Sequence, residues 1–153
     1  MREGVADAIS MTFLVTLIGP TVVFMVTRVW WWLWLVAAIL GANVAVIGLK
    51  EMIAPAGSWA LRPPGAYGCD ALCAGGPVGG RPGFPSGHMT TATMFVVALW
   101  LRFSEPMILW VGVPWLFAMA WARWTKQCHN VIQIVGGTLF GGISAYACHL
   151  IAG

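Results

Sequence analysis

The chain is divided by a few charged residues into five long uncharged runs. These runs are 8–27, 29–49, 89–101, 106–122 and 130–148. A helix that crosses a bilayer needs about 20 predominantly apolar residues. The first, second and fifth runs meet this length and the fourth is slightly short. The third reaches it only if residues 86–88 belong to the helix. The pattern therefore predicts an all-α integral membrane bundle of about five transmembrane helices.

The first run has a second interpretation, as a cleaved signal peptide. The segment before it sets Glu3 and Asp7 against Arg2, so it is not basic, and no small-residue cleavage site follows it cleanly. We therefore interpret the run as a retained span. The length of the chain and the lack of an internal repeat or a separate soluble region predict one transmembrane domain over residues 1–153.

Composition excludes a soluble protein. The chain is 59% hydrophobic and only 8% charged, whereas soluble domains carry about 25% charged residues. Its formal charge of +3 is small and scattered, so we expect no nucleic acid partner. Ten tryptophans suit a bilayer partner, because their rings favour the headgroup level. The oligomeric state stays open.

Five spans send most of the polar chemistry to one face of the membrane. Short turns at Arg28 and at 102–105 lie on one side, while a long Gly/Pro-rich loop, 50–85, and a short loop, 123–129, lie on the other. Ionisable residues at membrane ends are functional candidates. For two of them we favour a snorkelling role instead. These two are Arg81 and Lys126.

The stretch from Ser86 to His88 stands between the long loop and the third run. A helix N-terminus there would offer unpaired N–H donors and a positive dipole end to a phosphate. The alternative is that Ser86 serves only as a helix N-cap. Each arginine on the same face can donate two parallel hydrogen bonds to phosphate oxygens. One histidine can act as the nucleophile and the other as the proton donor. The set is typical of a phosphate-ester site.

Three motifs carry a family resemblance. They are Lys50 with Arg62-Pro63, then Pro85-Ser86-Gly87-His88, then Arg123 followed six residues later by His129. In order and spacing they resemble the three-part signature of the type-2 phosphatidic acid phosphatase superfamily. That superfamily includes membrane lipid phosphatases and, more distantly, vanadium haloperoxidases. The resemblance covers roughly residues 50–133.

The resemblance implies a role for each matching residue. His129 is expected to be the nucleophile that forms a phosphohistidine, and His88 the general acid for the leaving group. The residues expected to bind the phosphoryl group are Lys50, Arg62, Arg123, Ser86 and the Gly87 amide. The family mechanism needs no metal and no cofactor. The resemblance also implies an active site on the extracytoplasmic or lumenal face.

The sequence departs from the family pattern inside the motifs. Eleven residues separate Lys50 from Arg62, where the family usually has six, and Ala122 precedes Arg123 in place of the usual Ser. Gln133 occupies the position of the Asp that orients the nucleophilic His. An amide supplies no negative charge and can present either end to the imidazole. We therefore expect Gln133 to slow the enzyme and Gln133→Asp to raise turnover.

The function expected is hydrolysis of a lipid phosphate or a polyprenyl pyrophosphate, with the lipid itself open. An alternative is a weak or inactive relative that binds lipid phosphate or has a structural role in a membrane assembly.

A third interpretation is a zinc site, for which zinc usually takes four Cys or His ligands. The candidates are Cys69, Cys73, Cys128 and His129, of which the last two are awkwardly adjacent.

The same cysteines bear on the compartment. A disulfide among the three that lie on this face would place it on an oxidising side of the membrane. The distribution of Lys and Arg between the loops does not decide the orientation, since several of these cations are proposed phosphate ligands.

Overall fold

The computed structural model describes residues 2–70, 72–73 and 75–152, and within these it contains helices, turns and loops but no strand. The first run forms α1 (Arg2–Met11), η1 (Thr12–Leu14) and α2 (Val15–Thr27), which follow one another without a break. The remaining long helices are α3 (Trp31–Ile53), α4 (Gly87–Phe103), α5 (Pro106–Thr125) and α6 (Val131–Ala152). The all-α membrane bundle is confirmed, since four helices are long and apolar enough to cross a bilayer: Glu3–Thr27, Trp31–Ala56, Pro106–Thr125 and Val131–Ala152.

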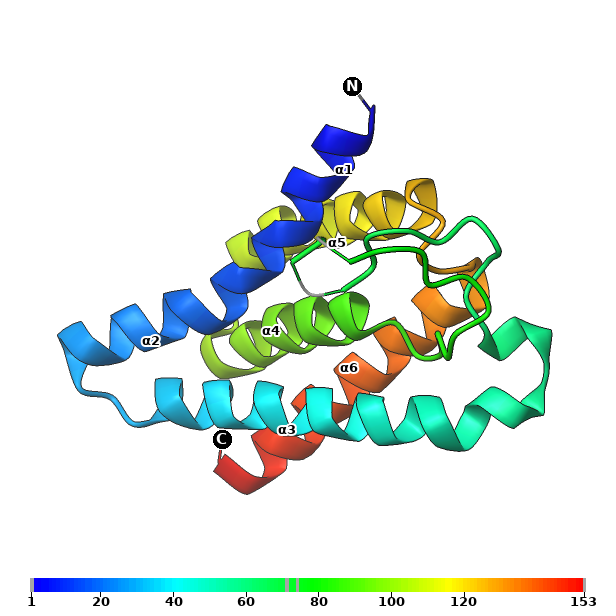
Figure 1. Ribbon diagram of the computed structural model, residues 1–153. Coiled ribbons are helices and arrows are strands. Elements are labelled where there is room, and N and C mark those ends of the chain that lie inside the picture. The colour runs from blue at the N-terminus through cyan, green and yellow to red at the C-terminus, as the bar shows by residue number, and fades with distance from the viewer. Residues whose placement is uncertain (1, 71, 74, 153) are drawn as a thin grey trace.

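The long helix that is not among these candidate spans is α4, which is the central helix of the bundle. It has 17 residues and contacts α3, α5 and α6 (Figure 1). Three of its threonines, Thr90, Thr91 and Thr93, are buried. The third uncharged run is therefore short and comparatively polar because its side chains face other helices and not lipid. Its helix begins at Gly87, inside the segment that the sequence required.

Close packing of α6 on α4 sets the distance between the second and third motifs. A Cβ atom at Gly137 or Gly141 would overlap the backbone carbonyl of Ser86 or Thr90. The backbone N–H of Ser86 also donates to the carbonyl of Gln133, at 3.0 Å. Small residues let helices approach this closely, so the start of α4 is held against the first turns of α6.

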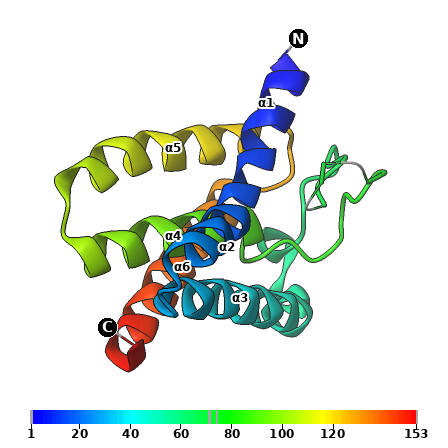
Figure 2. The same ribbon diagram turned by 90° about the vertical axis from the view of Figure 1, so that its left-hand side faces the viewer.

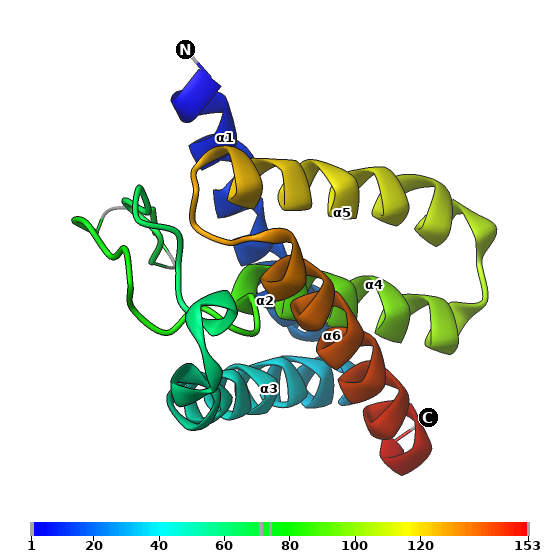
Figure 3. The same cartoon turned by 90° about the vertical axis from the view of Figure 1, so that its right-hand side faces the viewer.

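The polar connections gather at one end of the bundle, as predicted. In Figure 1 the turns after α2 and α4 lie at the left, while the long loop and the α5–α6 connection lie at the right. The long loop includes two short 3₁₀ turns, η2 (Ala54–Ala56) and η3 (Ser58–Ala60). Figures 2 and 3 show the loop standing outside the helices. A disulfide between Cys69 and Cys128 ties it to the α5–α6 connection.

Candidate active site

A cavity of about 240 Å³ opens at the loop end of the bundle. Five of the eight predicted site residues line it: Lys50, Arg62, Gly87, His88 and His129. They come from α3, the long loop, α4 and the segment before α6, so the fold brings all three motifs to one place.

The longer spacing between Lys50 and Arg62 does not separate them. The additional residues form η2 and η3, and between them the chain reverses at Gly57, whose φ of 137° is easily adopted only by glycine. Arg62 is then held by a hydrogen bond from its Nη1 to the carbonyl of Cys128, at 3.3 Å. Burial, with the nearby charges of Arg123 and Arg81, lowers the pKa of Arg62 to about 10. Its guanidinium therefore stays charged at neutral pH.

The tautomer of His129 is fixed by Gln133. The Nδ1 of His129 lies 3.0 Å from the Oε1 of Gln133. The Nε2 of the same amide donates to the carbonyls of Trp59, at 3.0 Å, and Leu61, at 2.7 Å. The amide cannot turn round without setting its oxygen against two carbonyl oxygens. The Nδ1 of His129 must therefore carry the proton, which leaves the lone pair on Nε2.

Electrostatics keep His129 neutral. Complete burial, together with the positive charges of Arg62 and Arg123, holds its pKa well below the usual 6.5. The hydrogen bond to Gln133 acts in the opposite direction but is a smaller effect. A neutral imidazole with a free Nε2 is the state required of a nucleophile.

His88 lies in the first turn of α4 and lines the same cavity. Its side chain is buried, and its Nε2 has no hydrogen-bond partner within the described part of the chain. A buried polar atom without a partner is costly, and a ligand in the cavity would supply one. The backbone N–H groups that begin α4 at Gly87 add the donors of a helix N-terminus at the cavity wall.

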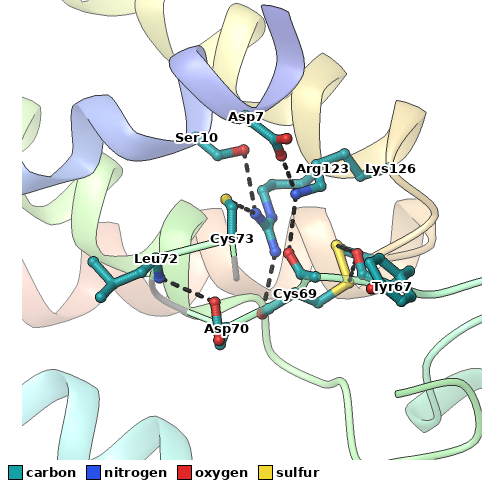
Figure 4. Close-up of polar contacts among 11 residues, drawn as sticks. Asp7, Ser10, Tyr67, Cys69, Asp70, Leu72, Cys73, Arg123 and Lys126 are labelled. Carbon is teal, nitrogen blue, oxygen red and sulfur yellow. Dashed lines mark hydrogen bonds and ion pairs between the residues drawn. A yellow bond between two sulfur atoms is a disulfide. The ribbon is translucent and has the colours of Figure 1, made fainter. Parts of the chain in front are cut away.

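Arg123 and Ser86 are fully buried and do not line the cavity. The guanidinium of Arg123 donates to the Oγ of Ser10 at 3.2 Å, the Sγ of Cys73 at 3.8 Å and the carbonyl of Cys69 at 3.4 Å (Figure 4). Ser86 stands at the N-cap position of α4, but its Oγ makes no capping bond. The expectation that Ser86 is the N-cap residue of this helix is therefore confirmed by its position, although its side chain makes no capping bond.

The family model of the PAP2 superfamily matches residues 31–153. The chain belongs to the PAP2 superfamily. This confirms the type-2 phosphatidic acid phosphatase resemblance that the three motifs carried. Members of the superfamily are generally phosphatases, so a hydrolase of phosphatase type follows from membership. The match includes α3 to α6 and leaves α1, η1 and α2 outside it. No curated protein and no solved structure gives a significant match.

The cavity of this PAP2 protein has further lining residues that the motifs did not indicate. Asn43 and Thr91 line it and are hydrogen-bonded to each other at 2.9 Å. Phe13 and Asp70 also contribute to the wall. Asn43 could have been identified from the sequence as a candidate site residue, because it is a polar side chain inside an uncharged membrane run. Phe13 had none, since it is one apolar residue among many.

The interpretation of a zinc site is wrong, because two of its proposed cysteine ligands are bonded to each other. The disulfide takes Cys69 and Cys128, two of the four proposed ligands. Within the described ranges no group of three or more His, Cys, Asp or Glu side chains is placed to hold a metal ion.

The snorkelling interpretation is also wrong for Lys126. Its ammonium binds the carboxylate of Asp7 and the carbonyl of Gly68. Arg81 is exposed, as a snorkelling residue would be.

Proposed function

We propose that this PAP2 protein hydrolyses a lipid phosphate or a polyprenyl pyrophosphate through a phosphohistidine on His129. One observation carries the proposal: His129, with its Nδ1 on the Oε1 of Gln133, shares a cavity with His88 and two cations. Burial and the neighbouring positive charges lower the pKa of His129, which favours the neutral nucleophile. The cavity lies at the end of membrane-spanning helices, where the headgroup of a bilayer lipid would meet it.

In the first step, the Nε2 of His129 attacks phosphorus. An N–P bond forms while the bond from phosphorus to the leaving oxygen breaks. His88, which carries a proton once the anionic phosphate is bound beside it, donates that proton to the leaving oxygen. Lys50 and Arg62 stabilise the charge on the phosphoryl oxygens. In the second step, water attacks phosphorus with His88 as the base. The N–P bond breaks and inorganic phosphate leaves.

The positive charge that many phosphatases take from a metal comes here from side chains. Lys50 and Arg62 are on the cavity wall, and Arg123 lies behind it. We therefore propose metal-independent hydrolysis. Its expected signatures are turnover in the presence of a chelator and inhibition by vanadate, which resembles the five-coordinate transition state.

Gln133 sets the reaction rate in this proposal. Its amide fixes the tautomer of His129, but it carries no charge to stabilise the imidazolium character that grows during attack. In a serine-protease triad the corresponding exchange of Asp for its amide costs about 10⁴ in turnover, through loss of the tautomer as well as the charge. Since the tautomer is kept here, the reduction that we propose is smaller than that.

The active-site face is proposed to be extracytoplasmic or lumenal. The disulfide between Cys69 and Cys128 lies on the same face as the cavity, and Cys69 itself lines it. Disulfides persist in oxidising compartments and are rare in the cytosol, which supports this orientation.

One feature favours the alternative of a weak phosphate binder. The guanidinium of Arg123 is occupied by Ser10, Cys73 and Cys69 and does not face the cavity. A phosphate held only by Lys50 and Arg62 has fewer charge-assisted bonds than the motifs suggest.

Phosphate release by purified protein separates the two functions. The substrates are short-chain phosphatidic acid, phosphatidylglycerophosphate and a polyprenyl diphosphate, and the proteins are wild type, His129→Ala and His149→Ala. His149 lies near the far end of α6, so its variant is the matched histidine control. The proposal expects turnover of at least one lipid by wild type and the control, and none by a folded His129→Ala. If wild type binds phosphate but turns over none of the lipids, the protein is the inactive phosphate-binding relative and the phosphatase proposal fails.

A further inference from the structure

We propose that the N-terminal helix, meaning α1 with η1, positions residues of the active site, although it lies outside the family match. Ser10 in α1 positions Arg123, and Phe13 in η1 positions His88. The inference rests on the proposed phosphatase function, and it assigns to Ser10 and Phe13 a part in that reaction which the three motifs do not include.

The contact between Ser10 and Arg123 joins residues 113 positions apart. Both side chains are fully buried. The bond from Nη1 to the Oγ of Ser10, at 3.2 Å, is shorter than those to Cys69 and Cys73. The Nε of Arg123 is the donor without a partner among the described residues. Ser10 therefore fixes the rotation of the guanidinium behind the cavity wall, where its positive charge acts on a bound phosphate without contacting it.

Phe13 acts on the other motif residue at the cavity. Its ring centroid lies 4.8 Å from that of His88, with 60° between the ring planes. Aromatic pairs at this separation attract one another, and Phe13 lines the cavity beside the imidazole. The ring limits the rotation of His88, whose Nε2 otherwise has no described partner to hold it.

Separate contacts hold the N-terminal helix in place. Lys126 binds Asp7, and the indole Nε1 of Trp115 donates to the Oγ1 of Thr12 at 2.7 Å. Figure 4 shows Asp7 and Ser10 pointing from α1 towards Lys126 and Arg123. Because these anchors do not involve the hydroxyl of Ser10, the helix stays docked when that hydroxyl is removed.

The first test compares Ser10→Ala with Thr12→Val, purified full length. Thr12→Val is the matched control, since it removes an anchoring bond next to the same helix, and the hydrogen bonds of the Thr12 hydroxyl go to Ile9 and Trp115, neither of which is a motif residue. The readouts are KM and kcat for a short-chain lipid phosphate and the inhibition constant of inorganic phosphate. Ser10→Ala should weaken phosphate inhibition and lower kcat/KM by about tenfold, because small misplacements of the groups around a substrate are costly in catalysis. Thr12→Val should stay within about twofold of wild type.

The second test uses the leaving group. If Phe13 positions the general acid, Phe13→Leu should lower turnover of an alkyl phosphate by about fivefold or more. It should leave a nitrophenyl ester nearly unchanged, because a good leaving group needs no proton. A purely structural role for Phe13 would affect both substrates equally.

The outcomes separate this inference from the proposed function. Active wild type with Ser10→Ala equal to Thr12→Val, and with Phe13→Leu equally slow on both esters, overturns the inference and leaves the phosphatase intact. Wild type that neither hydrolyses nor binds phosphate overturns both.

Discussion

Gln133→Asp is the substitution for which the structure changes the expected result. From the sequence, Asp restores the family residue and raises turnover. In the structure, the Nε2 of Gln133 donates hydrogen bonds to the carbonyls of Trp59 and Leu61, and an ionised carboxylate has no N–H or O–H to replace them. Asp is also one methylene shorter, so it draws away from the loop that leads to Arg62. We therefore predict a slower and less stable protein.

The magnitude follows from which groups lose a partner. The carbonyl of Trp59 keeps a bond from Asn130, at 3.0 Å, whereas the carbonyl of Leu61 loses its only described side-chain donor. An unsatisfied part-buried carbonyl costs about 1–3 kcal/mol, and a lost bond whose acceptor keeps a partner costs about 1 kcal/mol. The sum is about 2–4 kcal/mol, a large part of the stability of about 5–15 kcal/mol typical of one domain.

The assay measures stability and turnover together in detergent. Thermal unfolding of Gln133→Asp should shift down by about 10 °C, using the usual relation for a chain of this length. Turnover of a short-chain lipid phosphate should fall roughly tenfold or more, because small misplacements of binding groups are costly in catalysis. Gln133→Glu keeps the length, loses the same two N–H donors and adds the same negative charge as Asp, so the difference between the two variants isolates the effect of the shorter side chain. An Asp variant that unfolds with wild type and turns over faster would refute the reasoning.

Four further predictions concern His129 and the cysteines. Turnover should not lose its nucleophile until the pH is well below 6.5, because the pKa of His129 is lowered. Stability should fall as the pH drops below 6.5, since the unfolded imidazole then binds a proton that the folded one does not. Unfolding and rate measurements across pH check both. Replacing Cys69 and Cys128 by Ser should lower the free energy of unfolding by about 2–4 kcal/mol. Cys73→Ser keeps the disulfide and should leave the free energy of unfolding unchanged. Denaturant unfolding of the two variants measures the difference. An impermeant thiol reagent should label Cys73 from the extracytoplasmic side of intact cells, and labelling from the cytoplasmic side alone would contradict the orientation.

Hydropathy predicted the five helices because lipid contact is a local property of each run. The run that became α4 was the hardest, since its outer surface is other helices. Threonines are accommodated there because neighbouring helices offer polar partners: Asn43 of α3 donates to the hydroxyl of Thr91. Length and apolarity alone cannot distinguish a central helix from an incomplete span.

The motifs predicted five residues of the cavity wall but not the partners behind it. Lys50, Arg62, His88 and His129 are brought together by the fold. The second function of the Gln133 amide depends on carbonyls 72 and 74 residues away, and no local pattern reports them. The burial of Arg123 against Ser10 is a contact of the same kind, between two helices that are far apart in the chain.

The most direct test of the account is the search for a phosphorylated histidine. A nitrophenyl phosphate ester labelled in the phosphoryl group is mixed with excess enzyme and quenched in base, where phosphohistidine survives. Wild type should carry transient label. His88→Ala should carry more, because its base for the second step is missing while the good leaving group needs no acid. His129→Ala should carry none. Label of equal size in His129→Ala, or phosphate release by wild type with no labelled protein at any time, would contradict His129 as the nucleophile.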